Sequence, residues 1–158
     1  MEFTINNILY KGELLSKVLY ANEDKSISKD LKIKIITFKI IFNDYIRDYQ
    51  KYINEVNEEL LTPRYTELVK NKINLTLDEE MELNKLESSM LEERNKLAEK
   101  KLNTIVDIKE ITKDNYFTKE EYKELLEINV DHTIVIGDTT VDGGNYCEEL
   151  YKEFVYIE

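Results

Sequence analysis

The sequence predicts a mainly α-helical protein, a long antiparallel helical hairpin of coiled-coil type with a small α+β cap at its C-terminal end. Apolar and aromatic residues between positions 31 and 60 recur at steps of four and three, which is the spacing of a helical seam. Only one proline and four glycines occur in 158 residues, so few positions break helices. After residue 102 the period changes to the alternation typical of strands.

The longest predicted helix covers residues 28–61. Ser28 is a suitable N-cap, and Pro63 lies just beyond the end, where its missing backbone donor stops the helix. A second stripe at steps of seven runs beside the seam, so we expect one wide buried face, with Phe38, Phe42 and Tyr45 in the hairpin core. The seam consists of Leu31, Ile35, Phe38, Phe42, Tyr45, Tyr49, Tyr52, Val56 and Leu60, and the second stripe of Ile46, Ile53 and Leu60.

The elements on either side of this helix complete the predicted hairpin. Residues 3–5 favour a short extended start, and residues 6–21 a helix. Thr62 and Pro63 can restart a helix, whose apolar face would be Tyr65, Leu68, Val69 and Ile73. Thr76 and Glu79 form a capping-box pattern that opens the return helix, residues 77–102. Its expected buried positions are Leu83, Leu86, Met90 and Leu97, with Leu91, Ala98 and Leu102 alongside.

The last third of the chain predicts mixed structure. Residues 104–111 are rich in β-branched side chains and indicate a strand. A second capping box, Thr118 with Glu121, opens a helix to about Ile128, and residues 133–136 and 139–141 indicate two further strands. We therefore expect two parts: residues 1–102, the N-terminal helix with the hairpin, and residues 103–158, an acidic α+β cap.

The charge of the chain is negative and unevenly distributed. Residues 103–158 carry 14 acidic and 5 basic side chains, so this third holds 9 of the 11 net negative charges. Such a balance argues against direct binding to nucleic acid or to an anionic membrane. The sequence contains no signal peptide or long apolar span, and its single cysteine cannot form an internal disulfide. We expect a cytoplasmic protein.

The sequence offers little catalytic chemistry. His132 and Cys147 are the sole histidine and cysteine, and neither has a recognisable partner for nucleophilic catalysis. No phosphate-binding loop or zinc-ligand spacing is present. The sequence therefore predicts neither an enzyme nor a cofactor.

One weak metal motif occurs near the C-terminus. Asp138, Asp142 and Glu149 occupy positions 1, 5 and 12 of an EF-hand-like calcium loop, with Gly143 at the sharp turn. Thr140 at position 3 is a poor ligand, and a strand precedes the loop where a helix is needed. A plain turn is the favoured interpretation.

Two groups of residues are candidates for partner binding. Tyr49 and Tyr52 extend the seam beyond its internal partner, and tyrosine suits interfaces because its ring packs while its hydroxyl stays hydrated. They predict self-association or a protein partner along the long helix. The acidic candidates, which would meet a basic surface, are Glu110, Asp114, Glu120, Glu121, Glu124 and Glu127.

The order of these features resembles a family of small proteins of unknown activity that are encoded near the structural genes of tailed bacteriophages. The features are the LSKVL run at residues 15–19, KIK at 32–34, a Glu-rich return helix, VDI at 106–108 and the box at Thr118 and Glu121. The resemblance implies a phage-encoded virion or assembly accessory protein that acts through protein–protein contacts in the host cytoplasm or the virion. The alternative is an acidic inhibitor that occupies a basic, nucleic-acid-binding surface of a host defence enzyme.

Overall fold

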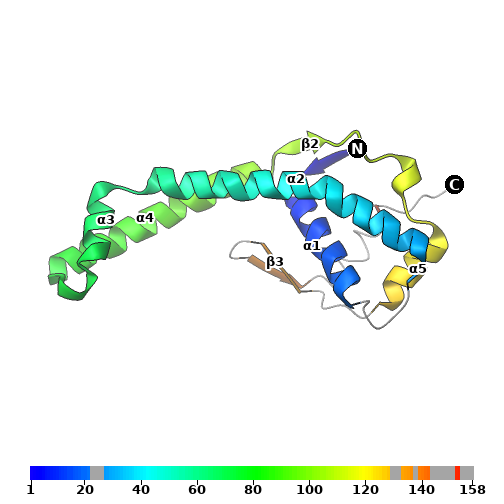
Figure 1. The fold of residues 1–158 in the computed structure, drawn as a ribbon. Helices are drawn as coiled ribbons and strands as arrows, with labels where there is room; N and C mark the ends of the chain where they lie inside the picture. The colour runs from blue at the N-terminus through cyan, green and yellow to red at the C-terminus, as the bar shows by residue number, and fades with distance from the viewer. Residues whose placement is uncertain (22–26, 129–132, 137–138, 143–151, 154–158) are drawn as a thin grey trace. The chain divides into compact units, whose positions relative to one another are not determined.

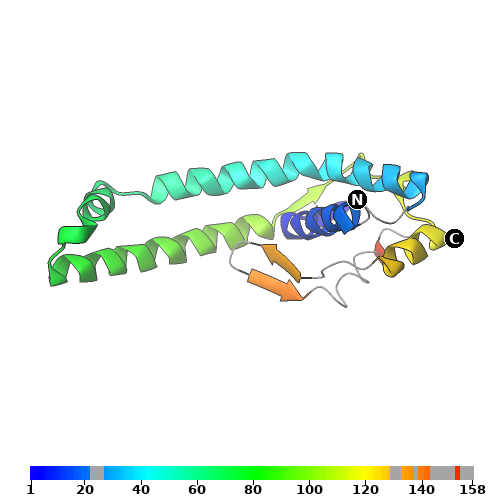
Figure 2. The same ribbon diagram turned by 60° about the horizontal axis from the view of Figure 1, so that its bottom comes forward.

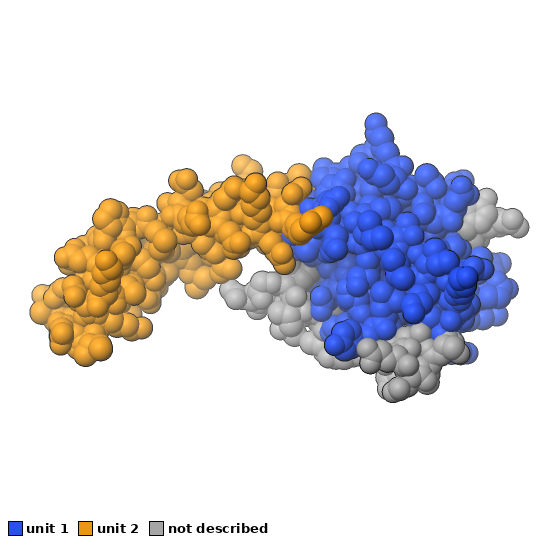
Figure 3. Space-filling model, viewed as in Figure 1, with its two compact units in different colours: residues 1–46, 105–158 blue, residues 47–104 orange. Residues whose placement is uncertain are grey.

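The computed structural model describes residues 1–21, 27–128, 133–136, 139–142 and 152–153, and for 133–136 and 139–142 the backbone alone. The fold is mainly α-helical, as predicted, with two long helices, α2 (Lys29–Leu60) and α4 (Leu77–Leu102) (Figure 1). The chain forms two compact units (Figure 3). Unit 1 contains residues 1–46 and 105–158, and unit 2 contains residues 47–104; helix α2 contributes to both.

Unit 2 is the helical hairpin. The end of α2 and the whole of α4 run antiparallel, and α3 (Pro63–Lys70) and the short 3-10 helix η1 (Lys72–Asn74) connect them (Figure 2). Thr62 caps α3 by accepting a hydrogen bond from the backbone N–H of Tyr65, at 3.1 Å. Thr76 and Glu79 form the predicted capping box of α4. The expected bounds of the return helix are confirmed because strong capping chemistry fixes them.

The interior of unit 2 is thin. Among the described residues, the buried hydrophobic side chains of this unit are Val56, Leu68 and Leu83. Leu86, Met90 and Leu97, which we expected to be buried, are partly exposed. Two helices packed side by side enclose little volume, so polar contacts supplement the core. Arg64 donates from Nε and Nη2 to the carboxylate of Glu82, each at 2.9 Å.

The apolar face predicted for α3 is wrong in its second half. Tyr65 is half-buried and Leu68 is buried, but Val69 and Ile73 are exposed. The reason is that α3 ends at Lys70, so Ile73 does not continue its helical spacing but lies in η1. Val69 lies within α3, next to the buried Leu68, and its side chain is 42% exposed.

Unit 1 joins the two ends of the described chain. Strand β1 (Glu2–Thr4) pairs antiparallel with β2 (Ile105–Asp107), with Phe3 opposite Val106. Helix α1 (Ile5–Ala21) follows β1, and the segment after β2 leads through the 3-10 helix η2 (Lys113–Asn115) to α5 (Lys119–Glu127). Strands β3 (Thr133–Ile136) and β4 (Thr139–Asp142) form a second antiparallel hairpin, and β3 lies against α1.

The core of unit 1 is built around a row of four aromatic rings. Phe38 and Phe42 of α2 have ring centroids 5.9 Å apart, Phe3 of β1 meets Phe42 at 5.8 Å, and Phe117 meets Phe38 at 5.7 Å. All four side chains are buried. The first half of the seam is thus buried as predicted, but by β1 and the segment before α5. The prediction that the hairpin buries Phe38, Phe42 and Tyr45 is corrected accordingly, and Tyr45 is only half-buried.

The two units do not follow the expected division after residue 102. The boundaries between them lie after residues 46 and 104. Residues 1–46 group with residues 105–158 because β1 pairs with β2 and Phe3 and Phe117 pack on α2. Such contacts between distant parts of the sequence leave no local signal.

Gly12 marks a close approach between α1 and α2. A Cβ atom at this position would lie 2.8 Å from Cδ1 of Ile46, which is shorter than real contacts allow. Glycine in the middle of a helix normally costs stability, and here its missing side chain leaves room for Ile46, so α1 and α2 pack closely.

We expect Phe42→Ala to lower the free energy of unfolding by about 3–5 kcal/mol, because it removes a buried ring that touches both Phe3 and Phe38. Denaturant unfolding measures this loss. The matched control is Ile40→Ala on the exposed side of the same helix, which should change stability little. A loss below about 1 kcal/mol for Phe42→Ala would contradict the aromatic core.

Candidate interaction surfaces

Of the predicted acidic contacts, Glu121 lies inside unit 1. Its backbone N–H donates to Oγ1 of Thr118 at 3.2 Å, and its carboxylate accepts from the N–H of Thr118 at 3.3 Å, which completes the capping box of α5. Lys34 of α2 donates to the same carboxylate at 2.6 Å. Glu121 is 7% exposed, and its Oε2 has no hydrogen-bond partner among the described residues. The structure therefore gives Glu121 the role of joining α5 to α2.

Glu124 also makes an internal contact. Its carboxylate accepts hydrogen bonds from the backbone N–H of Ser28 at 3.0 Å and from Oγ of Ser28 at 2.8 Å. Ser28 itself caps α2, since Leu31 N–H donates to its Oγ at 3.4 Å. A carboxylate at this position is favoured by the positive end of the helix dipole. Glu124 thus fixes the start of α2.

The remaining acidic candidates are exposed and available to a partner. Glu110, Asp114, Glu120 and Glu127 are all exposed. They do not form one exposed acidic row with Glu121 and Glu124, because those two carboxylates accept hydrogen bonds from Lys34 and Ser28. Their contact with a partner stays a prediction.

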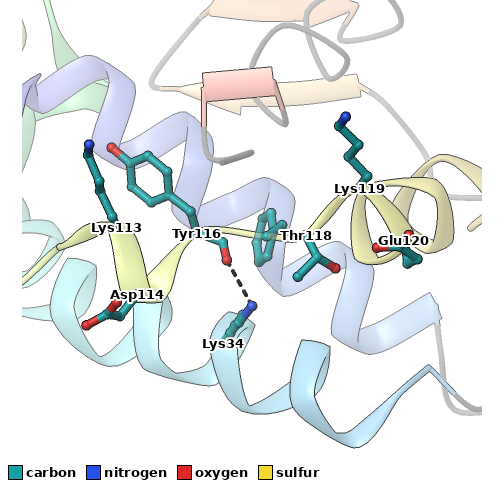
Figure 4. Close-up of a pocket in the computed structure, with 8 residues that line it drawn as sticks. Lys34, Lys113, Asp114, Tyr116, Thr118, Lys119 and Glu120 are labelled. Carbon is teal, nitrogen blue, oxygen red and sulfur yellow. Dashed lines mark hydrogen bonds between the residues drawn. The ribbon is translucent and has the colours of Figure 1, made fainter. Parts of the chain in front are cut away.

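A pocket of about 630 Å³ lies where η2 and the start of α5 meet α2 (Figure 4). Lys34 enters it from α2 and donates to the backbone carbonyl of Tyr116 at 2.9 Å. Three lysines and two carboxylates line it, so their charges largely offset one another. Its lining consists of Lys34, Lys113, Asp114, Tyr116, Phe117, Thr118, Lys119 and Glu120. Sequence reasoning missed this pocket because it forms only where residues 113–120 meet Lys34, which lies about 80 positions earlier in the chain.

The two tyrosine candidates belong to unit 2 and are half-buried. The ammonium group of Lys101 lies over the ring of Tyr52, 5.2 Å from its centroid. Burial raises the pKa of Tyr49, and the nearby charge of Arg94 opposes that rise. Tyr52 therefore contacts α4 and Tyr49 lies near the charge of Arg94, and a partner could reach the exposed part of both rings.

A second candidate surface, which we call the hairpin end, was not predicted. It consists of exposed apolar side chains around the connection between α2 and α4. Ile73 is 98% exposed, Leu77 is 73% and Met81 is 63%. Leu77 and Met81 are one helical turn apart and so share a face of α4. The hairpin end comprises Leu61, Val69, Ile73, Leu77 and Met81. The sequence did mark Ile73 as an apolar residue that needs a packing partner, because its spacing predicted a buried position. The structure shows that the chain itself does not cover it.

The candidate metal and nucleophilic residues fall mostly outside the described part of the chain. His132, Asp138, Cys147 and Glu149 are not described, and of Asp142 only the backbone, in β4, is described. Among the side chains that are described, no cluster of three His, Cys, Asp or Glu residues could hold a metal ion.

Lys11 is a buried cation in unit 1. It is 1% exposed, forms an ion pair with Glu153, and its ammonium lies over the ring of Phe3, 4.4 Å from the centroid. Loss of hydration on burial lowers the pKa of Lys11, and the hydrogen bond and the charge of Glu153 oppose this effect. Lys11 therefore ties α1 to Glu153, and its ammonium group lies on the ring of Phe3 in the aromatic core.

Comparison with known proteins adds no relative. The sequence matches no protein-family model, and neither a curated protein nor a solved structure is found to be similar to it. Within the described part of the chain, no helix combines the length and the apolar character needed to cross a bilayer.

Glu124→Gln should lower the free energy of unfolding by about 1 kcal/mol, because a neutral amide accepts more weakly from Ser28 and loses its attraction to the helix dipole. Glu120→Gln and Glu127→Gln are matched controls on the same helix and should leave stability within about 0.5 kcal/mol. Urea unfolding of the three variants tests the assignment. Equal losses in all three would contradict it.

Lys11→Met should change how stability depends on pH. The folded protein releases the Lys11 proton at a lower pH than the unfolded chain, so between these pKa values the unfolded chain binds more protons and folding gains stability as pH rises. The free energy of unfolding of wild type minus that of Lys11→Met should therefore increase as pH approaches 10.5, the ordinary lysine pKa. Unfolding of both proteins at several pH values measures the difference. A difference that falls over this interval would show that the pKa is raised.

Proposed function

We propose that the protein is a non-enzymatic protein–protein interaction protein that binds through the long helix and the hairpin end. The observation that carries the proposal is the exposure of Ile73, Leu77 and Met81 at one end of unit 2. Single exposed apolar residues are common on proteins, whereas several at one connection are typical of interaction sites.

The energetics of the hairpin end support this role. Burial of an isoleucine or leucine side chain contributes about 1.5–3 kcal/mol, and the fold gains almost none of this from Ile73. A partner that covers the hairpin end would gain it. Lys70 and Lys72 precede Ile73, and Asp78 and Glu80 lie between Leu77 and Met81, so charges of both signs surround the apolar residues. A partner surface with an apolar centre and a polar edge fits best.

The resemblance to small phage-encoded proteins suggests the biological setting. A helical hairpin with an exposed apolar end suits a virion or assembly accessory protein, which acts by holding other proteins together. We propose the host cytoplasm or the virion as its location. Self-association through α2 belongs to the same proposal.

The acidic inhibitor remains a second candidate because the four exposed carboxylates Glu110, Asp114, Glu120 and Glu127 lie in the segment with the densest negative charge. Ionic strength separates the two functions. Binding through the acidic residues must weaken steeply as salt is added, whereas binding through the hairpin end should change little.

Capture of partners from native or infected cells tests the proposal. We expect the double variant Ile73→Lys with Leu77→Lys to fold with wild-type stability, because both side chains are largely exposed, and to lose at least about tenfold of partner enrichment. Quantitative mass spectrometry of the captured proteins measures this.

The matched control is Leu91→Lys, an exposed leucine of α4 outside the hairpin end. It should retain every partner. Equal enrichment by wild type and the double variant would refute the hairpin end as the binding site. If Glu120→Gln with Glu127→Gln instead abolished capture at physiological salt, the inhibitor would be the better account.

A further inference from the structure

Helix α2 has a second apolar face in unit 1, on the side away from the core. Ile33 is 52% exposed, Ile36 is 40% and Ile40 is 66%. At about 100° per residue, these three side chains point roughly opposite to the buried row of Leu31, Ile35, Phe38 and Phe42. We call Ile33, Ile36 and Ile40 the isoleucine stripe.

A helix with apolar residues on two opposite faces is normally covered on both. In unit 1 the fold covers one face, and the described chain leaves the isoleucine stripe exposed. Isoleucine is also a poorer helix former than the charged residues that usually fill solvated positions, so the helix gains nothing locally from three of them. The stripe therefore indicates a helix-on-helix contact with another molecule.

The charges at the two ends of the stripe point to a particular occupant. Lys29 and Lys32 lie at its N-terminal end beside Asp30, and Asp44 lies at its C-terminal end with Arg47 one turn further; all five are exposed. The orientation of the occupant is inferred from the pair formed by Lys29 and Asp44. Lys29 and Asp44 are equally far from the midpoint of the stripe, between Ile36 and Thr37, at about 11 Å along the axis. A second α2 placed antiparallel over this midpoint brings Lys29 opposite Asp44 and Ile33 opposite Ile40. A parallel arrangement would bring like charges together.

We propose that the isoleucine stripe binds a second copy of this chain, as a two-fold antiparallel pair of α2 helices. A two-fold contact requires a self-complementary surface, and the exchange of Lys29 with Asp44 and of Ile33 with Ile40 meets that requirement. A shallow crossing angle of about 20° lets both ion pairs form beside the isoleucines. This inference rests on the proposed interaction function, and it names the partner for one face of α2.

The contact area of two helices is small by the standards of stable dimers, so association should be weak and dependent on concentration. Sedimentation equilibrium of the full chain over roughly 1 μM to 1 mM covers the relevant range. We expect a reversible monomer–dimer equilibrium. Ile36→Glu with Ile40→Glu should raise the dissociation constant roughly 100-fold or more, while thermal unfolding stays unchanged because both residues are exposed. Leu126→Glu, an exposed leucine on α5, is the matched control and should dimerise as wild type.

Charge reversal tests the antiparallel arrangement. Lys29→Glu and Asp44→Lys should each weaken the dimer about two- to fivefold, and the double variant should recover toward wild type. A strictly monomeric wild type, or a dimer that survives Ile36→Glu with Ile40→Glu, would overturn the proposal. So would a double charge variant weaker than both single ones.

These results are independent of the hairpin end. Ile73→Lys with Leu77→Lys should still dimerise, and Ile36→Glu with Ile40→Glu should still capture the partners bound at the hairpin end. A different outcome is a monomeric wild type whose captured partners are lost in the variant Ile36→Glu with Ile40→Glu. That outcome would show that the stripe binds another protein, and it would exclude a second copy of this chain.

Discussion

The burial of Phe38 and Phe42 is the constraint on which unit 1 depends. Both rings lie on one face of α2, and two segments more than 70 residues apart in the sequence, β1 and the residues before α5, supply Phe3 and Phe117 to cover them. Pairing of β1 with β2 brings the second segment alongside the first. Edge-to-face contacts between the rings add specificity to the burial of apolar area, so this row also sets how the elements of unit 1 are oriented.

Hydrogen bonds and ion pairs of charged side chains add to the stability that the aromatic row gives unit 1. Lys34 reaches from α2 to the cap of α5, Glu124 reaches from α5 to the start of α2, and Lys11 lies over Phe3 while pairing with Glu153. Each contact satisfies a helix end or a buried charge that would otherwise cost stability. Part of the negative charge of the C-terminal third is thus structural. Of the six acidic candidates, all within the described residues, two are engaged inside the chain and four are exposed. This favours the proposal of an interaction through apolar surfaces.

The two units use helix α2 differently. In unit 1 its seam is enclosed, and the opposite side still carries three exposed isoleucines. In unit 2 the seam continues as half-buried tyrosines against α4, and exposed apolar side chains gather at the connection between the helices. Both units therefore present apolar surface that their own folds do not cover. A protein whose function is to bind other proteins needs surface of this kind, at the cost of stability that each unit could have gained by covering it.

The sequence alone determined the helices, because their signals are local, whereas the strand expected over residues 104–111 is confined to Ile105–Asp107. Thr62, Thr76 and Thr118 with their capping partners set the starts of α3, α4 and α5, and the helical seam defined α2. The tertiary structure decided which elements share a core, since Phe3, Phe38 and Phe117 are close in space and distant in sequence. It also decided which carboxylates are exposed and that Ile73 faces solvent. Periodicity predicts that a side chain will be buried against apolar groups. Only the folded structure shows whether elements of the same chain bury it.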